Sequence, residues 1–155
     1  MKVAIFDYGA GNIFSLKNSL EKNGAQVDII TSLNKSKEYS GLLLPGVGNF
    51  DPAVRSIRDY SSTDLKIPHM GWKSLEIKRQ SNFLDGVKDS SWVYFVHSYM
   101  IKAKETELII ANTDYGIKVP AIIEQKNFIG TQFHPEKSGK VGSLMLSNFL
   151  SECKK

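Results

Sequence analysis

The sequence predicts an α/β domain with an open, mostly parallel sheet. Three features support this fold class. Residues 2–7 form a short apolar run that ends just before Gly9 and Gly11. A helical pattern follows this run, and further short apolar runs follow the helical pattern. Strands that alternate with helices are typical of parallel sheets, whose strands are apolar along their length because both faces are buried.

Length and composition restrict the possible classes of protein. The 155 residues suit one domain, residues 1–155, and a hydrophobic content of 41% is that of a globular protein. The net charge of +4 comes from scattered basic residues, which does not favour binding to nucleic acid. No apolar stretch approaches the ~18 residues of a membrane span, and Asp7 interrupts the first apolar run. We therefore expect neither a membrane segment nor a signal peptide.

The cysteine content indicates the compartment. The single cysteine, Cys153, excludes an intramolecular disulfide and any metal site built from several cysteines. Such a chain is typical of a reducing compartment, because oxidising compartments favour paired cysteines. We therefore expect a cytoplasmic protein.

One helix and two strands follow the first strand. Apolar residues recur at helical spacing over residues 13–20, and Asn23-Gly24 provides a stop, because glycine readily adopts a positive φ after the last turn. Residues 27–29 alternate apolar and polar side chains and indicate a second strand. Residues 41–44 are a third strand, and it leads into Pro45.

A second helix is predicted next, and the expected alternation then fails. Asp51 is a good helix cap, and Pro52 is tolerated in the first turn, so a helix should run to about residue 60. Residues 61–65 join this helix directly to the PHMGW segment. No further strand and helix lie between them, so one unit of the α/β pattern is missing.

The C-terminal half has a different pattern. Four strand-like runs lie close together, at residues 92–101, 107–112, 119–124 and 127–133. Their spacing predicts an antiparallel or mixed section of sheet. A final helix has one apolar face, made by Val141, Leu144, Met145 and Phe149.

The segment QFHPE combines two side chains that can carry chemistry. It lies where a predicted strand ends, which is where open α/β sheets place functional residues. Histidine is the usual side chain for proton transfer near neutral pH, so His134 can act as a general base, while Glu136 can orient the imidazole and stabilise its charged form. The alternative is a surface ion pair, because a histidine two residues from a glutamate often arises by chance.

The segment PGVG is a second candidate. Glycine allows unusual backbone angles, so Gly46, Val47 and Gly48 can point backbone N–H groups at a developing oxyanion. The alternative is an ordinary turn between a strand and a helix.

Other candidate motifs are weaker. We expect His69 and His97 to be structural residues, since a lone histidine in an apolar run is more often that than a ligand. The glycines near the N-terminus do not match G-x-G-x-x-G, because Phe14 occupies the third glycine position. The histidines lack the H-E-x-x-H spacing, so we expect no metal site. We also expect no cofactor.

The order of the motifs is more specific than any one of them. DYGAGN, LPGVGNF, PHMGW, YFVHSY, TDYG and QFHPEKSG follow one another along the chain. Together they resemble the glutamine amidotransferase subunits of imidazole glycerol phosphate synthases, a class I amidotransferase family of histidine biosynthesis. The resemblance covers nearly the whole chain. It implies the open α/β fold of class I glutamine amidotransferases.

The resemblance also implies a reaction and a partner. In that family a cysteine on a nucleophile elbow attacks the side-chain amide of glutamine, a histidine transfers the proton and a glutamate orients the histidine. The ammonia passes to a (β/α)₈ cyclase subunit in a heterodimer, which forms imidazole glycerol phosphate and a carboxamide ribotide. No cofactor, nucleic acid or membrane is implied.

The motif matches assign roles to residues of this chain. They imply His134 as the base, Glu136 as the orienting acid, and Gly46, Val47 and Gly48 as the oxyanion strand. They imply Ser98 and Tyr99 as the lining of the glutamine site, and Asn12, Trp72 and Lys137 as contacts with the cyclase.

One element of the family pattern is missing. No G-x-C-x-G elbow, and no G-x-S-x-G replacement, lies between PGVG and PHMGW. A strand, a turn and a helix need at least about 20 residues, so we expect an internal deletion near residues 61–65 and loss of the elbow strand and helix. Cys153 lies in the last predicted helix without such an elbow, so we expect an ordinary thiol there and little glutaminase activity. Two alternatives stay open, a non-catalytic module that binds the cyclase and an artefactually truncated gene product.

Overall fold

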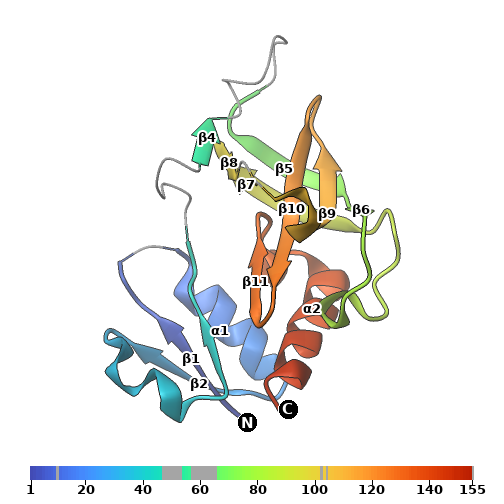
Figure 1. Ribbon diagram of the computed structural model, residues 1–155. Helices are drawn as coiled ribbons and strands as arrows, with labels where there is room; N and C mark the ends of the chain where they lie inside the picture. Colours follow the sequence, from blue (N-terminus) through green and yellow to red (C-terminus); the bar gives the residue numbers. More distant parts are fainter. Residues whose placement is uncertain (10, 47–53, 57–65, 102, 104, 155) are drawn as a thin grey trace.

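A parallel sheet of three strands forms the N-terminal part of the protein. The computed structural model describes residues 1–9, 11–46, 54–56, 66–101, 103 and 105–154 (Figure 1). The strands are β1 (Lys2–Phe6), β2 (Gln26–Ile30) and β3 (Gly41–Leu43), in the order β2-β1-β3 with parallel pairing. The predicted α/β class with a parallel sheet is confirmed.

Helix α1 (Ile13–Lys22) connects β1 to β2. It begins after Asn12, whose side-chain Oδ1 accepts a hydrogen bond from the backbone N–H of Ser15 at 3.2 Å. This bond satisfies one of the free N–H groups of the first turn. Gly24 follows the end of the helix with a φ of +84°, as the Asn-Gly stop predicts. Leu16 and Leu20 are buried against β1, whose central residues are fully buried.

The C-terminal part is antiparallel. Strands β6 (Glu76–Ile77), β9 (Ile109–Asp114), β10 (Lys118–Gln125) and β11 (Phe128–Thr131) form a sheet in the order β11-β10-β9-β6. Strand β5 (His69–Ser74) pairs with β7 (Trp92–His97), and β4 (Val54–Ser56) pairs with β8 (Tyr99–Ile101). All these pairs are antiparallel, within the antiparallel or mixed pattern that the sequence predicts.

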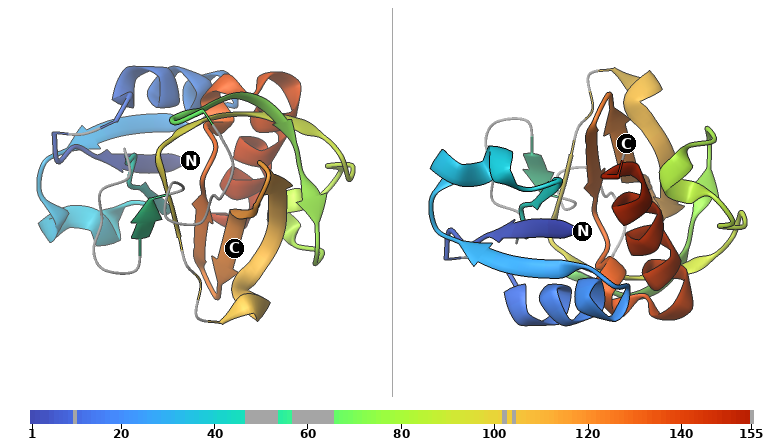
Figure 2. Two further views of the ribbon diagram at one scale, coloured as in Figure 1. Left: turned by 90° about the horizontal axis from the view of Figure 1, so that it is seen from above. Right: turned by 90° about the horizontal axis from the view of Figure 1, so that it is seen from below.

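The C-terminal helix α2 (Gly139–Glu152) takes part in both cores. Met145 belongs to the core of the antiparallel strands, while Leu146 and Leu150 belong to the core beneath the parallel sheet. Figure 2 shows the N-terminal strands beside the antiparallel strands, with α2 against the latter. The apolar face is therefore wider than predicted, and Leu144 lies at its edge with 37% of its surface exposed. None of the helices in the described part of the chain is both long and apolar enough to cross a membrane.

Short 3₁₀ helices complete the connections. They are η1 (Leu33–Glu38), η3 (Asn82–Leu84), η4 (Thr106–Leu108) and η5 (Pro135–Lys137).

The helix predicted from Asp51 to about residue 60 is wrong where the structure describes it. Residues Val54–Ser56 are strand β4, and Val54 is the register partner of Ile101 in β8. Local helix signals are weak, and pairing with a distant strand overrides them here. The remaining residues of that predicted helix, and the junction at 61–65, lie outside the described residues.

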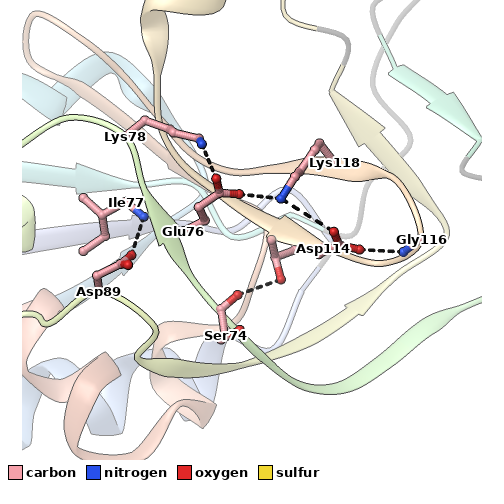
Figure 3. A network of polar contacts seen from close by, with 9 residues as sticks. Ser74, Glu76, Ile77, Lys78, Asp89, Asp114, Gly116 and Lys118 are labelled. Atoms are coloured by element: carbon pink, nitrogen blue, oxygen red, sulfur yellow. Dashed lines mark hydrogen bonds and ion pairs between the residues drawn. The ribbon is translucent and has the colours of Figure 1, made fainter.

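A polar network holds β6 against the β9–β10 hairpin (Figure 3). Lys118 Nζ lies 2.6 Å from Glu76 Oε2 and 3.6 Å from Asp114 Oδ2, and Lys78 donates to the other oxygen of Glu76. Thr113 Oγ1 donates to the carbonyl of Ser74 at 2.9 Å, which joins the same hairpin to β5. These contacts fix the outer edge of the antiparallel sheet.

Candidate functional site

Strand β7 anchors the loop that carries the QFHPE motif. The backbone N–H of His134 donates to the carbonyl of Tyr94 at 2.9 Å, and the N–H of Tyr94 donates to Ser138 Oγ at 3.0 Å. The ring of the buried Phe133 packs edge-on against Phe95, with 5.7 Å between the ring centroids. Backbone and side-chain contacts with one strand therefore hold both ends of the loop.

The loop places His134 and Glu136 in direct contact. The Nδ1 atom of His134 lies 3.0 Å from Oε1 of Glu136, and 21% and 7% of the two side chains are exposed. An ionised carboxylate only accepts hydrogen bonds, so Nδ1 carries the proton of the neutral imidazole. Nε2 is then left with a free lone pair, which is the form that a general base needs.

The start of α2 packs closely on this loop. Ser138 is 2% exposed, and its hydroxyl donates to the carbonyl of His134 at 2.7 Å. A Cβ atom at Gly142 would lie 1.9 Å from the carbonyl oxygen of Pro135, so only glycine fits at that position. The loop conformation therefore depends on the first turn of α2 as well as on β7.

Ser98 and Tyr99 lie at the far end of β7. Ser98 forms a bend between β7 and β8, and 40% of the surface of Tyr99 is exposed. His97, directly before the bend, is buried, and burial lowers its pKa. A positive charge on His134 lowers the pKa of His97 further. The residue before the bend and the QFHPE loop therefore interact electrostatically. Strand β7 thus anchors the QFHPE loop and leads directly into the Ser98 bend.

The oxyanion strand lies mostly outside the described residues. Gly46 is exposed after β3, while Val47 and Gly48 are beyond the described range. Gly11, with a φ of +87°, lies against Pro45, because a Cβ at Gly11 would be 3.0 Å from the Cβ of Pro45. The turn after β1 therefore packs at the start of the PGVG segment.

The three residues implied as cyclase contacts are exposed. Asn12 caps α1, and α1 in turn contacts η5, where Lys137 is exposed. Trp72 is 47% exposed on β5, and its ring packs edge-on against Tyr94, with 5.8 Å between centroids. Each of these residues therefore belongs to an element that contacts the QFHPE loop or the strand that anchors it.

His69 and His97 form a pair that the sequence did not predict. Nδ1 of His69 lies 2.8 Å from Nε2 of His97, and the two residues are register partners in β5 and β7. Both are buried, as expected for structural histidines. The hydrogen bond joins them into one pair. Within the described ranges, no group of three or more His, Cys, Asp or Glu side chains is arranged to hold a metal ion.

Cys153 is poorly placed to act as a nucleophile. It caps the C-terminus of α2, and its Sγ lies 2.6 Å from the position that a Cβ of Gly41 would take. Burial raises the pKa of its thiol, so the reactive thiolate is disfavoured. The 14 residues of α2 rise about 21 Å, which separates Cys153 from the QFHPE loop at the other end of the helix.

Comparison with known proteins identifies the family. The class-I glutamine amidotransferase family model matches residues 57–153. The HisH subunit of imidazole glycerol phosphate synthase from Archaeoglobus fulgidus is 38% identical, over 99% of this chain and 100% of its own length. The HisH subunit from Caldanaerobacter subterraneus subsp. tengcongensis is 33% identical, over 95% of this chain and 96% of its own length. The alignment with the Archaeoglobus protein runs over 197 positions, so that relative has residues without a counterpart among the 155 here.

Solved structures show the same fold at low identity. A Thermoplasma acidophilum protein described as a component of GMP synthase superposes with a TM-score of 0.78 at 16% identity, covering 99% of this chain and 94% of its own. PurLQS from Thermotoga maritima gives 0.73 at 13% identity, with 97% of both chains covered. The family model matches residues 57–153 and the HisH relatives match nearly the whole chain, so this chain belongs to the class-I glutamine amidotransferases, the family of the HisH subunits of imidazole glycerol phosphate synthase.

Proposed function

We propose that this chain is the amidotransferase subunit of an imidazole glycerol phosphate synthase and works with a cyclase subunit. One observation carries the proposal, the 3.0 Å contact between His134 Nδ1 and Glu136 Oε1 within the QFHPE motif. The names of the relatives support it, because each is a subunit of that synthase. The cytoplasmic location expected from the single cysteine is part of the same proposal.

The proposed reaction is hydrolysis of glutamine to glutamate and ammonia. His134 would take a proton from the attacking group and return it to the leaving ammonia, while Glu136 stabilises the imidazolium. Ser98 and Tyr99 would line the glutamine site, and the N–H groups of Gly46, Val47 and Gly48 would stabilise the oxyanion. The cyclase would use the ammonia to form imidazole glycerol phosphate and the carboxamide ribotide of histidine biosynthesis.

We also propose that this polypeptide has little glutaminase activity of its own. It has no G-x-C-x-G elbow, and its only cysteine is Cys153, at the wrong end of α2. A base and an orienting acid without a nucleophile leave only the residual rate that comes from binding and oxyanion stabilisation. Deletion of a strand-turn-helix unit near residues 61–65 accounts for the missing elbow.

A second candidate function is binding without catalysis. Here the chain would dock on the cyclase through Asn12, Trp72 and Lys137 and modulate it without making ammonia. The exposed indole of Trp72, next to the strand that anchors the QFHPE loop, favours this candidate, because exposed tryptophans are common interface anchors. An artefactually truncated gene product is the third possibility.

A glutaminase assay tests whether the chain lacks a nucleophile. The chain is mixed with purified cyclase and its nucleotide ligand, and glutamate release is compared among the unaltered chain, His134→Ala and the exposed control Lys140→Ala. We expect little turnover in all three. Near-normal turnover that His134→Ala abolishes and Lys140→Ala retains would contradict the missing nucleophile.

Two simpler observations complete the test. Co-purification with the cyclase, together with cyclase activity on supplied ammonia only, supports the binding module, and failure to bind removes it. Resequencing the coding DNA across residues 61–65 distinguishes a shortened gene from an error in the gene sequence.

A further inference from the structure

The buried pair of His69 and His97 links strands β5 and β7 directly before the Ser98–Tyr99 bend. Nδ1 of His69 lies 2.8 Å from Nε2 of His97. Only 1% of His69 and 8% of His97 is exposed. The proposed reaction uses neither side chain, although His97 comes directly before Ser98. We therefore looked to the contacts of these two buried imidazoles for a separate role.

The contacts determine which nitrogen of each ring carries the proton. Nδ1 of His97 lies 2.9 Å from the carbonyl oxygen of Tyr99, which only accepts, so Nδ1 must donate. A neutral imidazole has one N–H, so Nε2 of His97 accepts a hydrogen bond from Nδ1 of His69. Nε2 of His69 is then an unprotonated acceptor, and it has no hydrogen-bond partner among the described residues.

The surroundings keep both rings neutral. His69 stacks between Tyr115 and Phe95, with centroid distances of 3.8 and 4.8 Å. Burial lowers the pKa of His69 to about 3, and the charges of His97 and Lys73 add to the effect. Burial also lowers the pKa of His97, a protonated His134 lowers it further, and the bond to the Tyr99 carbonyl opposes the shift. Both pKa values therefore lie below that of free histidine, which favours neutral rings and the bond directions given above.

These bonds act on one short piece of backbone. Ser98 is a single-residue bend between β7 and β8, and the His97 side chain bridges it to reach the Tyr99 carbonyl. The bond fixes the plane of the peptide that follows Tyr99. His69 holds the His97 ring in the tautomer that makes this bond, so the pair acts on the bend as one unit.

We propose that His69 and His97 are positioning residues, which hold the Ser98–Tyr99 bend in one conformation and so prepare it for a bound glutamine. The glutamine part rests on the proposed function. The Tyr99 carbonyl fixes the direction of both hydrogen bonds of the pair, because it can only accept. It touches no reacting atom, and its effect on a ligand passes through the bend.

The ring nitrogens provide the first test. The full chain is labelled with ¹⁵N in histidine, and its imidazole shifts are followed by NMR from about pH 5.5 to 8. We expect both buried rings to carry their proton on Nδ1 and to titrate below the usual pKa of histidine. A proton on Nε2 of His97, or titration of either ring near its usual pKa of about 6.5, would overturn the proposal.

Four variants provide the second test, with the amide shifts of Ser98 and Tyr99 as the structural readout. His69→Phe keeps a stacked ring but removes the donor, whereas the matched control Tyr115→Phe keeps its ring on His69 and loses only its bond to the Lys66 carbonyl. His97→Leu removes the donor to Tyr99, whereas His97→Asn supplies another. We expect the two amides to move in His69→Phe and His97→Leu, and to stay near their original shifts in Tyr115→Phe and His97→Asn.

Glutamine affinity, measured by calorimetry on the same variants, is the functional readout. Loss of one buried hydrogen bond corresponds to about tenfold in affinity, so we expect weakening of that order in His69→Phe and His97→Leu and little change in the other two. If the unaltered chain binds no glutamine, the proposed function fails, while the amide and ring shifts still decide the positioning role. Unmoved amides in folded His69→Phe and His97→Leu reject it.

Discussion

The hydroxyl of Ser138 accepts a hydrogen bond from the backbone N–H of Tyr94 at 3.0 Å. The same oxygen donates to the carbonyl of His134 at 2.7 Å, and Ser138 is almost completely buried. One side chain therefore satisfies a donor of β7 and an acceptor of the QFHPE loop. The geometry of the His134–Glu136 pair depends on this residue, although it takes no part in the proposed chemistry.

Replacing this hydroxyl should destabilise the protein. Ser138→Ala leaves the Tyr94 N–H and the His134 carbonyl with one partner fewer in a buried place. We expect a loss of about 1 to 3 kcal/mol in the free energy of unfolding, measured by urea denaturation. The control Ser151→Ala removes an exposed hydroxyl on α2 and should cost less than about 0.5 kcal/mol. Equal stability of the two variants would show that the Ser138 bonds add nothing.

The network around Glu76 should make stability depend on pH. Hydrogen bonds from Lys118 and Lys78 lower the pKa of this carboxyl from 4.5 to about 2. The folded state therefore favours the ionised form of Glu76. The contribution of this carboxylate to stability is complete above its unfolded pKa of 4.5 and is lost as the pH falls towards 2. We expect Glu76→Gln to reduce the stability lost between pH 7 and pH 3, as measured by urea unfolding at both values.

The control for this prediction is Glu107→Gln, which changes an exposed carboxylate in η4. It should leave the difference in stability between the two pH values nearly as it is in the unaltered chain. If both substitutions change that difference equally, the lysines around Glu76 do not stabilise its charged form.

Local signals predicted the parts of the fold that depend on neighbouring residues. The strands of the parallel sheet, α1 and the Asn-Gly stop follow from patterns within a few residues. The contact between His134 and Glu136 is also local, because only two positions separate them. The helix predicted from Asp51 fails because β4 pairs with β8, much later in the chain.

The histidine pair needed information that no local pattern contains. His69 and His97 are 28 positions apart, and they meet only in the antiparallel register of β5 and β7. Each histidine alone looks like an ordinary buried residue. The role of Ser138 depends in the same way on contact with Tyr94, 44 positions away.

Trp72 provides a test of the predicted cyclase interface. Trp72→Ala should weaken binding to the cyclase by at least about tenfold, because tryptophan is common among interface hot spots, whose truncation costs about 2 kcal/mol or more. Trp92 is the matched control, since it is also exposed, at 57%, and lies on the paired strand β7. Affinity is measured by calorimetry with the purified cyclase. A larger loss of affinity in Trp92→Ala than in Trp72→Ala would contradict the prediction and place the interface nearer Trp92.

Restoring the missing elbow is the last prediction. The Archaeoglobus fulgidus relative has residues without a counterpart here, and we propose that they include the segment between PGVG and PHMGW. Insertion of that segment at residues 61–65 should give glutaminase activity in the presence of the cyclase, because the base and the orienting acid are already in contact. His134→Ala in the extended chain should then reduce turnover by about 10³-fold or more, as loss of a triad base does.

The same segment with its elbow cysteine changed to alanine is the control for that insertion. It should bind the cyclase equally well and release no glutamate above the level of the unaltered chain. Activity that survives this change would mean that another group attacks the amide. The extended chain could also fold, bind the cyclase and stay inactive. The nucleophile, base and acid would then all be present without the geometry that couples them. Loss of the elbow would therefore not be what limits the reaction.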